Sequence, residues 1–170
     1  MIKILDAPPI NKKEIFRYLG GEIDDKILSD CLKEAELSYK VYYKILEKEE
    51  LSFKSKKLEK LLENSQYAVV FIATLGIPFD RLILKYTQTQ PSRALIFQAI
   101  GAERIEALCD EFMKEFNNTT ARFSPGYGDF DLSQQAKIFE ILKGDKPEVY
   151  LTESLLMTPK KSVSAVFGVR

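Results

Sequence analysis

The sequence contains no histidine and no tryptophan, only two cysteines, and no excess of either charge. Without histidine the chain cannot form a Ser-His-Asp triad or a histidine zinc site, and it has no histidine general base. It also carries neither a Gly-Lys-Ser/Thr phosphate loop nor a Gly-x-Gly-x-x-Gly fingerprint. The sequence motifs that usually indicate binding of nucleotide phosphates or dinucleotides are therefore missing. These absences favour a protein that binds and positions a ligand without strong acid–base catalysis.

Charge balance and hydropathy exclude further classes of protein. Lys and Arg residues number 25, as do Asp and Glu residues, so no long-range field concentrates nucleic acid or an anionic membrane. No apolar run is long enough to span a bilayer, and the start at Met1–Asp6 lacks the apolar region and cleavage site of a signal peptide. We therefore expect a cytoplasmic protein.

The length and the two cysteines suit one compact unit. A chain of 170 residues fits a single domain, 1–170, that buries roughly 70% of the surface its unfolded form exposes. Cys31 and Cys109 both fall on apolar stripes of helix-like segments. A free thiol there behaves as a small buried hydrophobe rather than a metal ligand or half of a disulfide. The sequence therefore predicts two buried thiols and no metal site.

Hydrophobic residues at helical spacing, preceded by capping residues, predict the helices. The longest should run from about Pro91 to Phe116, with Gly101 in its middle permitting close packing. Asn11 followed by Glu14 is a variant of the capping box and should begin the first helix. Asp24, Ser55 and Asp131 or Ser133 are expected to cap other helices, and a further helix should follow Pro78. The first and last helices should end at Gly20–Gly21 and Lys143–Gly144.

A change of period indicates the strands. Residues 39–45 alternate as in a strand with one covered face, and a short strand at Leu51–Phe53 is expected to pair with it. Tyr67–Ala73 is a continuous apolar run rich in β-branched residues, which suits a buried central strand. Two final strands are expected around Leu151 and over Val163–Phe167. Because strands and helices are interspersed without a strict βαβ rhythm, we predict an α+β fold with a mainly antiparallel twisted sheet and flanking helices.

One segment, Arg122–Asp129, points to a specific chemistry; it reads Arg-Phe-Ser-Pro-Gly-Tyr-Gly-Asp. Pro125–Gly126 predicts a type II turn, because proline fixes its own φ and glycine accepts the positive φ needed next. Arg122 offers a planar fork of donors for a carboxylate or phosphate, and Tyr127 adds an aromatic face with a hydroxyl. This is a candidate cradle for a small ligand. The same residues also fit an ordinary surface turn whose arginine is solvated or pairs locally.

Several segments resemble one known family when taken together. They are Arg17–Gly20, Ala73–Gly76, Arg122–Gly128, Leu151–Ser154 and Ser162–Ser164. In this order and spacing they resemble the activation domain of cobalamin-dependent methionine synthase, in its short, free-standing form. The resemblance covers most of the chain, and its specificity lies in the order and spacing of the last segments.

The resemblance implies a function in reactivation. In that family the domain binds S-adenosylmethionine and supports reductive methylation of cob(II)alamin. The chain would then serve a separate cobalamin-binding methionine synthase or related corrinoid protein, which carries the cobalamin, with a flavodoxin- or ferredoxin-type electron donor. It would be the detached component of a methyltransferase in methionine biosynthesis. Such a task needs position and electrostatics more than proton transfer, which fits a chain without histidine.

The same resemblance implies the ligand-binding residues, and it assigns no catalytic residue. Arg122 would pair with the methionyl carboxylate of S-adenosylmethionine. Backbone around Phe123, Gly126 and Tyr127 would line the adenosine side. Glu153, in the matching Thr-Glu-Ser segment, would either face the positive end of the ligand or hold its turn by accepting hydrogen bonds from backbone N–H groups.

Two departures from the family pattern leave other hypotheses open. Longer members continue past the Ser162–Ser164 strand into a segment with another aromatic ligand contact, whereas this chain stops at Arg170. The acidic residue that they place a few positions before Arg122 has no clear counterpart among Asn117–Thr120. A second hypothesis is therefore a docking or electron-transfer adaptor that keeps the fold without binding S-adenosylmethionine. A third is an independent methyltransferase for an acceptor that is already nucleophilic.

Overall fold

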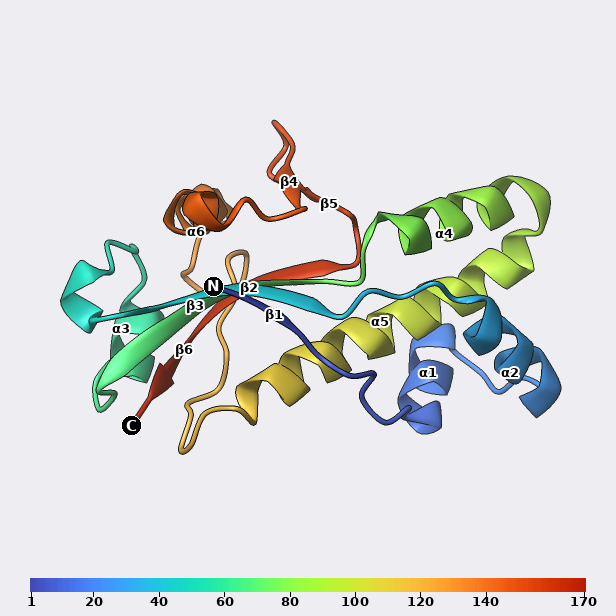
Figure 1. Cartoon of the computed structure of the whole chain (residues 1–170), viewed down its shortest axis with the longest axis horizontal. Helices are drawn as coiled ribbons and strands as arrows, with labels where there is room; N and C mark the ends of the chain where they lie inside the picture. The colour runs from blue at the N-terminus through green and yellow to red at the C-terminus, as the bar shows by residue number, and fades with distance from the viewer.

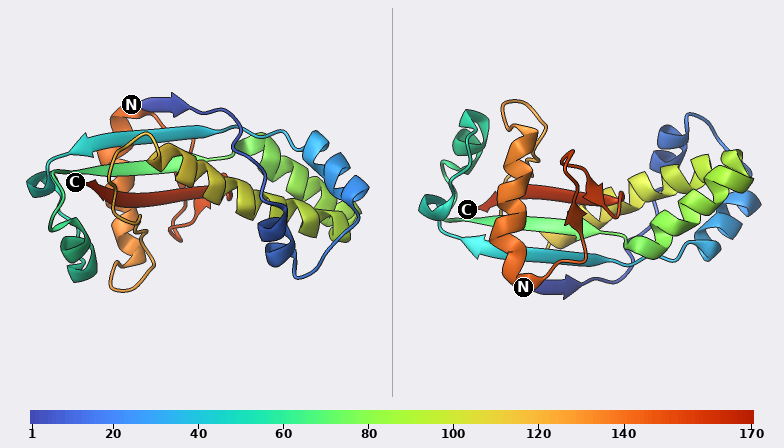
Figure 2. Two further views of the ribbon diagram at one scale, coloured as in Figure 1. Left: turned by 90° about the horizontal axis from the view of Figure 1, so that it is seen from below. Right: turned by 90° about the horizontal axis from the view of Figure 1, so that it is seen from above.

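The centre of the molecule is a four-stranded antiparallel sheet with the strand order β1-β2-β3-β6. A computed structural model describes residues 1–170. In it, α5 lies along one face of this sheet and α6 lies across the other (Figures 1 and 2). The strands are β1 Ile2–Ile4, β2 Lys40–Leu46, β3 Tyr67–Thr74 and β6 Ser162–Val169, with β4 Tyr150–Leu151 and β5 Met157–Thr158 in a separate hairpin. The helices are α1 Lys12–Leu19, α2 Asp25–Glu34, α3 Lys56–Leu62, α4 Ile77–Thr89, α5 Pro91–Met113 and α6 Gln135–Leu142.

Strand β3 joins two hydrophobic cores, one on each face of the sheet. Its residues alternate: Val69, Phe71 and Ala73 pack with α5, whereas Val70 and Ile72 belong to the core under α6 and α3. Because a hydrophobic core covers each face of β3, its side chains need an apolar environment on both faces, while β2 and β6 pair with its two edges. The continuous apolar run therefore has the predicted role of a buried central strand.

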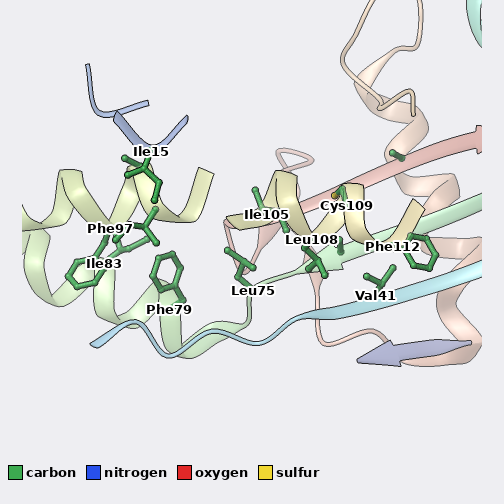
Figure 3. Packing of buried hydrophobic residues seen from close by; sticks show 14 of the residues in the cluster. Ile15, Val41, Leu75, Phe79, Ile83, Phe97, Ile105, Leu108, Cys109 and Phe112 are labelled. Atoms are coloured by element: carbon green, nitrogen blue, oxygen red, sulfur yellow. The ribbon is translucent and has the colours of Figure 1, made fainter. Parts of the chain in front are cut away.

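Helix α5 carries much of the larger core. Leu108, Cys109 and Phe112 face the sheet, while Phe97 meets Phe79 and Ile83 of α4 (Figure 3). A Cβ atom built on Gly101 would lie 2.6 Å from Cε1 of Phe79 and 2.9 Å from Cε of Lys161. Only a residue without a side chain allows this approach, so the expected close packing at Gly101 is confirmed.

The predicted caps at Asn11 and Ser55 are confirmed, whereas α4 begins at Ile77, one residue before Pro78, and Asp131 caps a short 3-10 turn that precedes α6. The side chain of Asn11 accepts from Glu14 N at 3.3 Å, and Ser55 Oγ accepts from Leu58 N at 3.0 Å. The reciprocal half of the capping box comes from another helix, because Asn11 N donates to Glu103 Oε1 of α5 at 2.9 Å. This bond fixes α1 against α5. Both cysteines are free and buried, as predicted.

Some strand predictions are wrong, and long-range packing explains each case. Residues Leu51–Phe53 form no strand; Phe53 is drawn instead into the core beside Phe130, with 5.3 Å between ring centroids. Strand β2 does not have one covered face, because Val41 packs under α5 while its neighbour Tyr42 is also buried on the α6 side. Strands β1 and β5 were not anticipated, since both are very short. None of the helices combines the length and the hydropathy that crossing a membrane requires.

Candidate functional site

A cavity of about 390 Å³ opens where α5, the segment after it and the start of β6 meet. This volume lies within the range of small-molecule sites. Far-apart parts of the chain contribute to it, so the cavity exists only in the folded protein. Its lining residues are Glu106, Arg122, Phe123, Ser124, Pro125, Tyr127, Gln135, Met157, Ser162, Val163 and Ser164.

The Arg122–Asp129 segment is held against the edge of the sheet. Phe123 N donates to Val166 O at 2.8 Å, and Val166 N donates back to Phe123 O at 3.0 Å. The Phe123 ring also stacks on Phe130, which is fully buried, with 5.7 Å between the ring centroids. Strand β6 and the second core thus fix the position of the segment.

The turn has the expected geometry. Tyr127 N donates to Ser124 O at 3.3 Å, and Gly126 has a φ of 93°. Positive φ at the third residue is the requirement of a type II turn, and glycine meets it without strain. Gly126 itself shapes the turn, while Tyr127 stands at the mouth of the cavity with 68% of its surface exposed.

Arg122 lies at the cavity wall between two carboxylates of α5. Its Nη2 donates to Glu106 and its Nη1 donates to Asp110, and Nη1 also lies 3.7 Å from Sδ of Met113. Burial of the side chain, which is 21% exposed, disfavours its charge, but the two carboxylates outweigh this effect and raise the pKa of Arg122 above its ordinary value. The guanidinium therefore stays charged. It pairs locally and faces the cavity at the same time.

Another part of the lining is polar, and its side chains are hydrogen-bonded within the protein. Ser164 Oγ donates to Gln135 Oε1 at 3.0 Å, and Gln135 Nε2 donates to Leu155 O at 2.7 Å. Ser162 Oγ lies 2.7 Å from Pro159 O and 2.9 Å from Thr74 Oγ1. These bonds tie the β4–β5 hairpin, α6 and β6 together around the cavity.

Sequence reasoning missed part of this lining. Glu106 and Gln135 carried no motif signal, because each is a single polar residue on a helix. The signal for Ser162 and Ser164 was present, since residues two apart on a strand face the same side, and the family segment already contained them.

The predicted site residues lie in and around the cavity, except Glu153. Arg122, Phe123 and Tyr127 line the cavity, and Gly126 forms the turn between them. Glu153 lies exposed in the turn between β4 and β5, outside the lining. The side-chain hydrogen bonds of that turn come from Thr152, whose Oγ1 accepts from Leu156 N at 3.0 Å.

Asp129 anchors the far end of the segment to α3. Its carboxylate accepts from Ser55 Oγ at 2.6 Å, Lys56 N at 2.8 Å and Lys57 N at 3.2 Å. The hydrogen bond from Ser55, together with those from the backbone, lowers the pKa of Asp129. Asp129 thus caps a helix distant in sequence.

The fold and the cavity define an α+β domain with a small polar site at the edge of an antiparallel sheet. Residues 99–169, which contain all of the lining, match the family model described as "Vitamin B12 dependent methionine synthase, activation domain". The predicted resemblance to activation domains of cobalamin-dependent methionine synthase is therefore confirmed.

A solved structure supports the same fold over the full length. It is described as the crystal structure of the MetH reactivation domain bound to AdoHcy, and it matches with a TM-score of 0.63 and 16% sequence identity. The match covers 99% of this chain and 78% of that chain. A comparison with curated proteins found no match. The predicted α+β architecture is confirmed.

Proposed function

We propose that this chain is an S-adenosylmethionine-binding reactivation module, which supports reductive methylation of cob(II)alamin on a separate cobalamin-dependent methionine synthase. The observation that carries the proposal is the cavity: Arg122, Glu106 and the Pro125–Gly126 turn meet there, within the residues that match the family model. The similar reactivation domain was solved with AdoHcy, the compound that remains when S-adenosylmethionine has given up its methyl group.

The charges at the cavity suit the amino-acid end of this ligand. A guanidinium donates charge-assisted hydrogen bonds to a carboxylate, and Arg122 supplies one for the α-carboxylate of the ligand. Glu106 lies beside Arg122 on the cavity wall, and its carboxylate would accept from the ligand ammonium. Backbone around Phe123, Gly126 and Tyr127 would line the adenosine. Glu153 lies outside the lining and would approach the positive end of the ligand by movement of its hairpin.

The remaining parts of the proposal concern the partner. The corrinoid, carried by a methionine synthase or related protein, supplies the nucleophile that accepts the methyl group. This chain's own residues bind the sulfonium compound, orient it and shield it from water. A flavodoxin- or ferredoxin-type protein would supply the electron, residues 1–170 would act as one domain, and the location would be cytoplasmic.

One observation favours the adaptor hypothesis instead. Both terminal nitrogens of Arg122 already donate to carboxylates of the protein, as in a purely structural arginine. An adaptor of this fold would dock on the corrinoid protein without S-adenosylmethionine. Pull-down with the synthase would separate the two, because an adaptor needs no ligand for complex formation.

Calorimetric titration with S-adenosylmethionine tests the ligand assignment. Arg122→Ala should weaken binding about tenfold or more, since a hydrogen bond to a charged group contributes about 1.5–3 kcal/mol. The matched control is Arg17→Ala, which removes an exposed arginine paired with Glu14 and should leave affinity unchanged. Equal affinity in all three proteins would remove Arg122 from the site. No binding by the folded wild type would refute the ligand and favour the adaptor.

A further inference from the structure

Three charged groups, one positive and two negative, form a cluster at the cavity wall. One guanidinium, that of Arg122, pairs with two carboxylates, Glu106 and Asp110, which lie four residues apart and therefore on one side of α5. With every group ionised, the cluster carries a net charge of −1. A ligand carboxylate that approaches Arg122 therefore meets repulsion as well as attraction.

The two carboxylates differ in their relation to the cavity. Glu106 lines both the cavity and the groove between α1 and α5, whereas Asp110 lines only the groove. The Asp110 side chain is 64% exposed, compared with 46% for Glu106. An exposed carboxylate released from its partner is readily hydrated, so an ion pair of this kind is weak. Breaking the ion pair between Arg122 and Asp110 therefore costs less free energy than breaking the pair between Arg122 and Glu106.

We propose that Asp110 is an internal competitor: it holds the Nη1 donor of Arg122 in the free protein and is displaced by the carboxylate of the bound ligand. This inference rests on the proposed function, since it concerns the same arginine. It gives Asp110 a role in specificity, because only ligands with a carboxylate have to displace it. Asp110 lowers the affinity for such ligands and leaves other ligands unaffected.

A purely structural role for Asp110 predicts the opposite sign. If Asp110 were needed to hold Arg122 in place, its loss would weaken binding. Other contacts already fix the arginine, however. Glu106 bonds to Nη2, Met113 Sδ lies 3.7 Å from Nη1, and the next residue, Phe123, pairs with Val166 of β6. Removing the Asp110 charge should therefore free a donor without freeing the side chain.

Titration calorimetry with Asp110→Asn tests the inference. The probes are S-adenosylhomocysteine, which carries the amino-acid carboxylate, and 5′-methylthioadenosine, which lacks the amino-acid portion. Asp110→Asn should bind S-adenosylhomocysteine about threefold more tightly than wild type, the scale of one exposed ion pair. Its affinity for 5′-methylthioadenosine should not change. The matched control is Glu111→Gln, which removes a neighbouring charge that pairs with Lys114 instead of Arg122 and should leave both affinities unchanged.

The outcomes separate this inference from the proposed function. Unchanged or weaker binding of S-adenosylhomocysteine by folded Asp110→Asn would overturn the competitor role while the ligand assignment stands. An equal gain in affinity with Glu111→Gln would mean that any lost negative charge nearby strengthens binding. That result would also overturn the competitor role of Asp110. If neither wild type nor Asp110→Asn binds S-adenosylhomocysteine, the proposed function fails and the inference fails with it. Loss of the gain when Arg122→Ala is added would show that Asp110 acts through Arg122.

Discussion

Cys109 shows how strongly position changes the chemistry of a single side chain. It lies on the face of α5 that packs against the sheet (Figure 3) and is completely buried. Burial raises the pKa of its thiol to about 12, from an ordinary value of 9.0, although nearby Arg122 opposes the shift. Since the thiolate is the reactive form, this residue is a packing element and not a nucleophile.

We expect the native protein to resist thiol reagents at pH 8 and both cysteines to react after unfolding. A chromogenic disulfide reagent, with and without denaturant, measures this. The raised pKa also fixes a direction for stability. The unfolded chain loses the Cys109 proton near pH 9 and the folded chain near pH 12. The contribution of this thiol to the free energy of unfolding is therefore fully present below pH 9 and declines as the pH rises from 9 to 12. Rapid labelling of the native protein would contradict the burial.

Helix α5 combines a packing surface with a charged edge. Its buried side supports the larger core, and its polar residues Glu106 and Asp110 meet Arg122 at the cavity. Gly101 lets α4 and the Lys161 side chain approach closely. The orientation of α5 thus determines where the acidic residues stand relative to the turn.

Gly101→Ala should destabilise the protein. Alanine is intrinsically better than glycine in a helix by about 1 kcal/mol, but its Cβ would lie 2.6 Å from the Phe79 ring, and overpacking of this kind costs about 1–3 kcal/mol. We expect a net loss of about 1 kcal/mol in the free energy of unfolding, measured by urea denaturation. Gly144→Ala is the matched control, because a Cβ there meets no atom within 4 Å. Equal free energies of unfolding for the two variants would show that α4 shifts to accommodate the new methyl group without loss of stability.

A buried ion pair connects the start of the chain to this helix. Arg104 and Glu103 are only 1% and 4% exposed. Arg104 donates to Pro8 O at 2.6 Å and to Pro9 O at 2.7 Å, while Glu103 accepts from Asn11 N. The pair therefore satisfies backbone groups of the connection between β1 and α1 as well as its own charges. Loss of one partner leaves the other charge buried.

Arg104→Met should lower the free energy of unfolding by about 3–5 kcal/mol, because the Glu103 carboxylate then has no counter-charge. Urea denaturation followed by circular dichroism measures the loss. The double variant Glu103→Gln/Arg104→Met removes both charges and should recover part of the stability. A single variant as stable as wild type would mean that solvent reaches Glu103 despite its burial.

Local patterns in the sequence predicted the helices well, because caps and apolar spacing act within a few residues. Asn11, Asp24 and Ser55 each accept the expected backbone N–H groups. The Pro125–Gly126 turn was predictable for the same reason, since its φ requirement belongs to the two residues themselves. The position of Phe53 was not predictable, because it depends on Phe130, far along the chain.

By itself the amino-acid sequence determined the α+β class, the buried central strand, the free thiols and the turn beside Arg122, since each follows from local propensity or from the period of hydrophobic residues. Only the tertiary structure decided what surrounds that arginine. Glu106, Asp110, Gln135 and Ser164 come from two helices and a strand, and nothing in their local sequence marks them as neighbours. Electrostatic interaction depends on distance in space and not on separation along the chain, so the charge of the site could be read only after folding brought these groups together.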